Sequence, residues 1–150
     1  MNVNYINPFV EASVNVLKSF CNMEAKLGRL SVKPIQFDEG SKVILIGITG
    51  QVKGQVFIGF NNKLACEIVS SMMGMAVDNI DALGESALAE IGNMIMGNTA
   101  TIFSTRNIKI DITPPTFAVG NMNFEMKGME HIFIPLIVGD KEIEMHVALK

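Results

Sequence analysis

The sequence has few of the residues from which metal centres, disulfide scaffolds and nucleophilic active sites are built. Its 150 residues include two cysteines and two histidines. Disulfide frameworks and metal sites need more ligands at closer spacing, so we expect no metal site and interpret Cys21 and Cys66 as buried free thiols in a reducing cytoplasm. Neither His131 nor His146 lies in a catalytic motif, and we expect both to be solvated.

Clusters of basic residues and long apolar runs are absent as well. The twelve Lys and Arg residues are scattered, the net charge is −3 and the pI is about 5.3, which argues against nucleic-acid binding. The apolar runs are far shorter than the roughly 20 residues of a membrane-spanning helix, and no signal-peptide pattern opens the chain. We therefore expect a cytoplasmic protein that binds neither nucleic acid nor membrane.

Apolar residues make up 49% of the chain and charged residues 18%, which excludes a disordered protein. A length of 150 residues suits one domain with a substantial core. No stretch resembles a linker, so we expect a single domain over residues 1–150.

Residues 81–104 are the most informative stretch. At about 100° per residue, their pattern predicts a helix with Leu88, Ile91, Ile95 and Ile102 in one apolar stripe. The opposite side carries small or polar residues: Ser86, Glu90, Asn93, Gly97, Thr101 and Ser104. Such a helix buries one side and presents the other.

Two glycines, Gly92 and Gly97, lie inside this predicted helix. Each costs on the order of 1 kcal/mol relative to alanine. Close approach of another backbone is the simplest feature that would offset this cost.

The rest of the chain alternates between helical and extended patterns. The helical patterns cover 8–23, with Asn7 as N-cap, and 62–73, with Asn62 as N-cap and Gly74 at the C-terminal end. We expect residues 105–115 to be a loop with an extended tail. Strands are predicted over 25–33 (weakly), 42–49, 55–60, 116–126, 130–138 and 143–149. Tight turns between consecutive strands indicate an α+β, two-layer fold, in which a mainly antiparallel sheet of about six strands packs against the helices.

Two features of the last strands carry further expectations. Pro135 lacks an amide hydrogen, which indicates a sheet edge or a bulge. In the final strand, Glu142, Glu144 and His146 alternate with apolar residues, so we expect this polar face to meet water.

Glu90 and Asn93 are the residues that could carry chemistry. Their i, i+3 spacing places both side chains on one helical face. A carboxylate can pair with a lysine of a partner, and a carboxamide can hold a water in a chosen orientation. The same pair also occurs by chance on solvated helix faces. The eleven methionines either fill the core or form a soft protein-binding rim.

Ser86-xxx-Glu90-xx-Asn93, followed by Gly97-Asn98 and by Pro115, resembles the signature of the CheC/CheX/FliY family of bacterial chemotaxis phosphatases. Family members with two active centres carry the Glu-xx-Asn pattern twice, whereas this chain carries it once. The single centre, the short length and the N-terminal helix are most similar to the CheX branch.

The resemblance implies a phosphatase that acts on the aspartyl phosphate of a CheY-type response regulator. Asn93 would orient the attacking water and Glu90 would pair with the regulator's lysine. The positions expected to contact the partner are Ser86, Met94, Gly97 and Thr101. The resemblance also implies no cofactor of its own, Mg²⁺ supplied by the regulator, and a homodimer formed through the sheets.

Two other functions are compatible with the residues. The same face could dock a receiver domain or a flagellar switch component without catalysis, and release of phosphate would discriminate the two. A small-molecule sensor that uses the interior between helix and sheet is the third possibility.

Overall fold

The computed structural model describes all 150 residues. Its helices are α1 (Val3–Cys21), α2 (Asn62–Met73) and α3 (Ala82–Thr105). Its strands are β1 (Lys26–Leu27), β2 (Ile35–Phe37), β3 (Lys42–Gly50), β4 (Gly54–Phe60), β5 (Ile110–Ile112), β6 (Thr116–Val119), β7 (Met122–Phe124), β8 (Glu130–Val138) and β9 (Lys141–Leu149).

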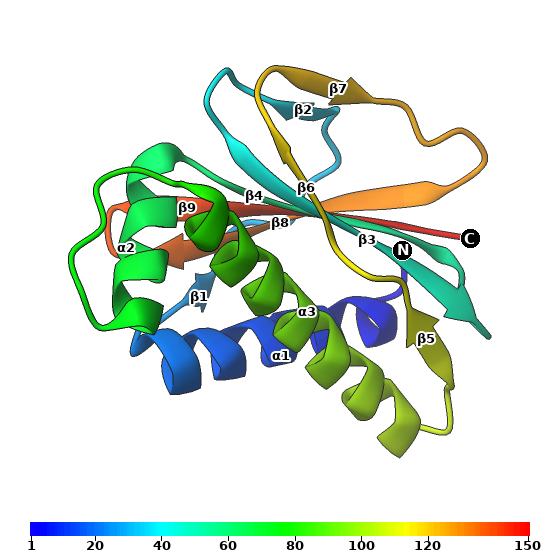
Figure 1. The fold of residues 1–150 in the computed structure, drawn as a ribbon. Helices are drawn as coiled ribbons and strands as arrows, with labels where there is room; N and C mark the ends of the chain where they lie inside the picture. The colour runs from blue at the N-terminus through cyan, green and yellow to red at the C-terminus, as the bar shows by residue number, and fades with distance from the viewer.

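Seven of the strands form one sheet in the order β1-β8-β9-β4-β3-β5, and β6 pairs with β3 alongside β5. Every pairing is antiparallel. The three helices lie on one side of this sheet, and a separate two-stranded sheet of β2 and β7 lies on the other side (Figure 1). The predicted α+β fold with a mainly antiparallel sheet is confirmed, whereas the β2–β7 sheet was not predicted.

The main core lies between the helices and the sheet. Alternate residues of the central strand β3, Ile44, Ile46 and Ile48, point into it and are buried. Val43, which precedes Ile44, faces the opposite side of the sheet and joins a small second core with Ile35, Phe37 and Phe57. The central strand is therefore buried on both faces, which agrees with its nearly continuous apolar sequence.

The second core overturns one expectation for the last strand. His146 is fully buried, not solvated, because the β2–β7 sheet covers that face. Its ring packs against Phe37 at 5.5 Å and Phe133 at 5.0 Å between centroids. Neither ring nitrogen has a hydrogen-bond partner. Burial, with smaller effects of Lys33 and His131, lowers the pKa of His146 from 6.5 to about 4.

Helix α1 begins five residues earlier than its sequence pattern predicted. Asn2 caps it by accepting a hydrogen bond from the amide of Asn4 at 2.9 Å, so the prediction of Asn7 as N-cap was wrong, and Pro8 lies inside the helix. A proline at that position cannot bond the carbonyl four residues earlier, which belongs to Asn4. The guanidinium of Arg106 donates to that carbonyl instead, at 3.1 Å. A tertiary contact thus compensates for the interior proline.

Three other boundaries differ from the prediction. Asn61 rather than Asn62 caps α2, accepting from the amide of Leu64 at 2.7 Å, while Gly74 ends the helix as predicted with φ +67°. The weak strand over 25–33 reduces to β1 and an isolated bridge between Ser31 and Phe133. The single strand over 116–126 is divided into β6 and β7 at Gly120, whose φ of +113° favours glycine.

Pro135 lies in β8 without a bulge, opposite Glu144 in an unbroken β8–β9 register. Both backbone groups of Phe133 bond to Ser31, on the side away from β9. Pro135, two residues on, turns its nitrogen to the same side, where β1 is only two residues long. Neither the edge nor the bulge is found, because β8 lies between β1 and β9 and the carbonyl of Pro135 accepts a hydrogen bond from the amide of Gly28 at 2.8 Å.

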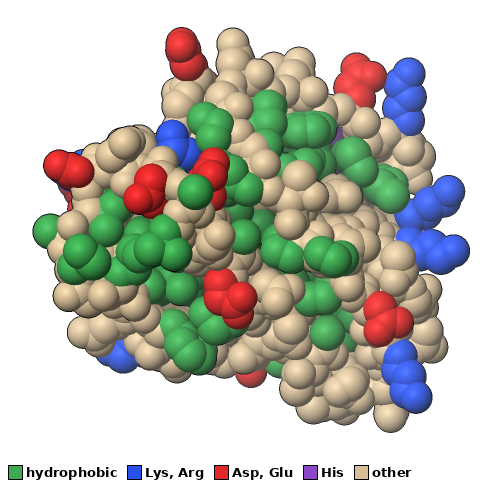
Figure 2. Space-filling view, in the orientation of Figure 1, with side chains coloured by type: hydrophobic (Ala, Val, Ile, Leu, Met, Phe, Trp, Pro, Cys, Tyr) green, Lys and Arg blue, Asp and Glu red, His purple; other side chains and the backbone are tan.

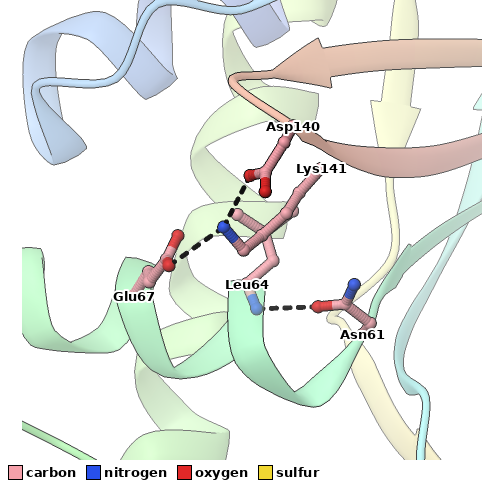
Figure 3. Close-up of polar contacts among 5 residues, drawn as sticks. All are labelled: Asn61, Leu64, Glu67, Asp140 and Lys141. Carbon is pink, nitrogen blue, oxygen red and sulfur yellow. Dashed lines mark hydrogen bonds and ion pairs between the residues drawn. The ribbon is translucent and has the colours of Figure 1, made fainter.

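An ion-pair cluster fastens the β8–β9 turn to α2. The ammonium group of Lys141 lies 3.2 Å from Glu67 and 2.9 Å from Asp140, beside the Asn61 cap of α2 (Figure 3). Hydrogen bonds to Asp140 and then Glu67 raise the pKa of Lys141. This cluster lies at the start of α2, the helix that precedes α3.

The cysteines are buried and unpaired, as expected. Burial raises the pKa of Cys21 to about 11, and burial followed by the charge of Asp78 raises the pKa of Cys66. Both thiols are therefore protonated near neutral pH. None of the three helices is both long and apolar enough to span a bilayer.

Candidate functional site on helix α3

Helix α3 begins where its sequence pattern predicted. The side chain of Asp81 accepts a hydrogen bond from the amide of Gly84 at 2.9 Å, and Glu85 lies in the first turn. Both carboxylates lie at the positive end of the helix dipole, where negative charge stabilises the helix. The residues ahead of the site are thus ordered by local interactions.

The inner face of α3 packs on the sheet and on α1. Leu88, Ile91 and Ile95 are buried as predicted, but Ile102 is only partly buried. Phe103 is the buried residue in the last turn instead. Its ring packs edge-on against the ring of Phe9 in α1, with 5.8 Å between the centroids. The last turn of this face therefore packs on α1 through Phe103.

The two interior glycines have different surroundings. A Cβ on Gly92 would lie 2.8 Å from Cγ2 of Ile44 in β3, so this glycine allows close approach of helix and sheet. A Cβ on Gly97 would meet no atom within 4 Å. The expected approach of another backbone is not found at Gly92, where the close neighbours are the side chains of Ile44 and Ile46, and nothing in this chain explains Gly97.

The outer face carries the residues predicted for the site. Ser86, Glu90 and Thr101 are exposed, and Asn93 and Gly97 are partly exposed. Met94, also predicted to contact the partner, is partly buried and packs against the main core. The structure therefore places Glu90 and Asn93 one turn apart on an accessible helix surface.

No side-chain hydrogen bond or ion pair within the chain involves Glu90 or Asn93. Later in α3, hydroxyl groups donate to carbonyls of the preceding turn, as from Thr99 to Ile95 at 2.8 Å and from Thr101 to Gly97 at 3.1 Å. The carboxylate of Glu90 and the carboxamide of Asn93 keep their full hydrogen-bonding capacity for another molecule.

The chain segment that carries the site contains acidic but no basic residues. From Leu64 to Thr105 the chain contains no lysine, arginine or histidine. The same stretch contains five carboxylates: Glu67, Asp78, Asp81, Glu85 and Glu90. Only Glu67 forms an ion pair, so the other four leave a negative field at the site that favours a basic partner.

The site is a helix surface and not a cleft. None of the surface cavities is lined by Glu90 or Asn93. The largest, about 640 Å³, opens beside α2 next to Met23 and Cys66. No three His, Cys, Asp or Glu side chains come together in a group that could hold a metal ion.

One residue of this face was missed from the sequence. Leu83 is 61% exposed and lies seven residues before Glu90, a spacing that returns to nearly the same side of a helix. That spacing was the signal that could have placed it with the site residues.

Glu90 and Asn93 thus lie on a helix surface that another protein can reach. The family model described as "Chemotaxis phosphatase CheX" matches residues 43–137. The chain is 30% identical over 154 residues to the CheY-P phosphatase CheX of Thermotoga maritima, covering 100% of this chain and 98% of that protein. The chain therefore belongs to the CheX family of chemotaxis phosphatases.

Solved structures agree with this assignment. A CheC-like superfamily protein from Shewanella sp. PV-4 superposes with a TM-score of 0.90 at 30% identity, covering 100% of this chain and 99% of that one. A CheX–CheY–BeF₃–Mg²⁺ complex from Borrelia burgdorferi contains a chain that matches with a TM-score of 0.82 at 30% identity, covering 99% of both chains. The family resemblance inferred from the Ser86 to Pro115 signature is confirmed.

Proposed function

We propose that this protein accelerates hydrolysis of the aspartyl phosphate of a CheY-type response regulator, through Glu90 and Asn93 of α3. The observation that carries the proposal is the exposed Glu90–Asn93 pair, which has no interaction within its own chain. Family membership supports it, because a relative at 30% identity is a CheY-P phosphatase. The absence of a cleft at the pair also supports it, since a projecting helix suits insertion into the cleft of another protein.

Asn93 acts on the attacking water. Its carboxamide oxygen accepts a hydrogen bond from the water and its NH₂ group donates one, which directs the water's lone pair at phosphorus. The water oxygen bonds to phosphorus as the bond to the aspartyl oxygen breaks. The products are inorganic phosphate and the regulator's free carboxylate. The rate gain comes from orientation of the nucleophile.

Glu90 orients the partner on the helix surface. Its carboxylate pairs with a lysine at the edge of the regulator's phosphorylation site, one helical turn from Asn93. An ion pair formed at a covered interface sets orientation as well as affinity. Ser86, Gly97 and Thr101 extend the contact along the same face, with Met94 at its edge.

The metal of the reaction belongs to the partner in this proposal. The complex from Borrelia burgdorferi contains Mg²⁺ together with CheY. This chain has no cluster of ligands for it, and Glu90 alone cannot provide a site. We propose that the regulator supplies Mg²⁺ and that this chain supplies the water-orienting and pairing groups.

We further propose a cytoplasmic homodimer, in which residues 1–150 act as one phosphatase domain and the sheets of two copies meet. The apolar strand β8 supports this arrangement, because its outer side is covered only by residues 26–31, through the two-residue β1, a hydrogen bond from Gly28 to Pro135 and the Ser31 bridge. Scattering at micromolar concentration should give the mass of two chains, and the mass of one chain would contradict the dimer.

The function is tested by following the decay of a phosphorylated CheY-type receiver with Mg²⁺ and catalytic amounts of this protein. We expect faster decay with the wild type and a loss of at least about 100-fold with Asn93→Ala. Ser104→Ala, which removes an exposed hydroxyl further along α3, is the matched control and should keep its activity. Unchanged decay despite complex formation would replace the phosphatase with a docking module.

A further inference from the structure

Exposed apolar side chains gather at the start of α3. Met75 is 63% exposed and Leu83 is 61% exposed, although both are large and apolar. They share a shallow hollow of about 340 Å³ in the α2–α3 connection with three further apolar residues. We call these five residues the methionine patch: Met73, Met75, Ala76, Val77 and Leu83. Figure 2 shows apolar side chains over this connection, on the left of the view, with acidic side chains among them.

The methionine patch continues the face that carries the site. Leu83 precedes Glu90 by seven residues, which places it within about 20° of the same direction and about 10 Å away along the helix axis. Leu83, Glu90, Gly97 and Thr101 therefore form one line on the surface, apolar at its first position and polar after that.

The size of a protein interface brings Leu83 into contact with any partner centred on Glu90 and Asn93. A standard interface covers about 800 Å² on each partner, equivalent to a disc of about 16 Å radius. Leu83, about 10 Å from Glu90, falls inside that disc. A folded partner seated on the catalytic pair must therefore cover Leu83, and Met75 shares its hollow.

The charges around the patch indicate the chemistry of that partner. Asp78 and Asp81 line the same hollow, and neither forms an ion pair. No basic residue lies between Leu64 and Thr105, and most Lys and Arg side chains in Figure 2 lie along the right edge of the view. A matching surface would be apolar at its centre and carry lysine or arginine at its rim.

We propose that the methionine patch is a second contact for the phosphorylated receiver domain, which binds it through an apolar surface bordered by basic residues. This inference rests on the proposed function, since the receiver is the partner that Glu90 and Asn93 engage. The patch holds the receiver equally before and during hydrolysis. It therefore determines affinity, and the catalytic pair determines the rate of the bound complex.

The test is a kinetic comparison of Met75→Ser/Leu83→Ser with the wild type on the phosphorylated receiver. We expect KM for the receiver to rise at least about tenfold while kcat stays within about twofold. The control is Val3→Ser, because Val3 is equally exposed at 57%. It lies next to Asn4, which contacts Arg106 at the far end of α3, about 24 Å from Glu90. Its KM should be unchanged, and circular dichroism should show native helix content in both variants.

Two outcomes would overturn the patch proposal: an unchanged KM, or a loss confined to kcat. Salt gives an independent measurement. KM of the wild type should rise with ionic strength, and it should rise less steeply in Asp78→Asn; equal slopes would count against the basic rim.

A binding titration of this protein with the receiver, in which hydrolysis is not measured, distinguishes failure of the proposed function from failure of the patch proposal. If the wild type releases no phosphate but binds the receiver, and the double serine variant binds at least about tenfold more weakly, the patch proposal stands and the phosphatase proposal fails. Equal binding by wild type and variant would overturn the patch proposal whatever the activity.

Discussion

Two sets of polar side chains without a partner in this protein differ in their access to solvent. On the outer face of α3, Glu90 is exposed, Asn93 is partly exposed, and neither bonds to the rest of the chain. Under the β2–β7 sheet, His146 is fully buried and both of its ring nitrogens lack partners. Water satisfies the first pair at no cost to folding, whereas the imidazole has lost its water without replacement.

The difference separates exposed groups, which we propose serve a partner, from a buried group that limits stability. An exposed unpaired group can be exchanged between water and another protein, so its removal should affect activity alone. A buried unpaired group changes the free energy of folding and its dependence on pH, so its removal should affect stability alone. The following variants test this contrast, from the largest expected effect to the smallest.

Glu90→Gln keeps the shape of the side chain and removes its charge. We expect kcat/KM for the phosphorylated receiver to fall by about 10²- to 10³-fold, because the receiver's lysine would be covered without a counter-ion. The melting temperature should not change. Glu11→Gln, which alters an exposed carboxylate on α1, should leave both quantities unchanged. A Glu90→Gln variant with native activity would remove Glu90 from the site.

His146 should make the protein less stable as pH falls from about 6.5 to about 4. The unfolded chain binds a proton at the ordinary pKa of 6.5, whereas the folded chain binds it only near 4. Protons therefore favour the unfolded state in this window, by up to about 3 kcal/mol at its lower end.

Urea unfolding of the wild type and of His146→Leu between pH 7 and pH 4 measures this effect. The carboxylates titrate in both proteins, so the difference between their curves isolates the histidine. The variant should lose less stability on acidification. Parallel curves would show that His146 does not cause the acid sensitivity, and phosphatase activity at pH 7 should be native in both.

Gly92→Ala tests how a change on the buried inner face of α3 affects stability. The new Cβ would lie 2.8 Å from Cγ2 of Ile44, and overpacking of this kind costs about 1–3 kcal/mol. We expect a net destabilisation of about 1–2 kcal/mol in urea unfolding, after the gain in helix propensity. In an Ile44→Ala background the clash is absent, so the same substitution should be neutral or stabilising. Equal effects in the two backgrounds would contradict the packing account.

Gly97→Ala is the matched change on the outer face and has the smallest expected effect on stability. Nothing lies within 4 Å of the added Cβ, so the variant should be stabilised by up to about 1 kcal/mol. If Gly97 leaves room for the receiver, hydrolysis should slow several-fold in the more stable protein. A stabilised variant with native activity would show that the glycine has no role in partner approach.

Local patterns were sufficient to predict α3 and the family, and they place the proposed site residues on one helix face. Leu88, Ile91 and Ile95 recur at helical spacing, and Asp81 caps the helix that they begin, so the two faces followed from short-range geometry. The string around Glu90 and Asn93 then identified the family. These features depend on residues close in sequence, which is why they needed no knowledge of the fold.

Long-range contacts account for the predictions that were wrong. Pro8 looked like the start of a helix because nothing nearby could bond the carbonyl of Asn4; Arg106, 102 residues away, bonds it. His146 alternated with apolar residues as a solvated side chain would, but β2 and β7 cover it. Residues 35–37 and 122–124 pair across the chain, and each segment alone is too short to show a clear strand pattern.

The sequence by itself determined helix α3, its polar face and the position of Glu90 and Asn93 on that face, because spacing along one helix places side chains on one side without help from the rest of the chain. Only the tertiary structure decided which unpaired groups meet water. It buried His146 beneath a second sheet, filled the space beside Gly92 with Ile44, and left Gly97 and Leu83 open. Solvent access depends on what the rest of the chain packs against a residue, and no local pattern contains that information.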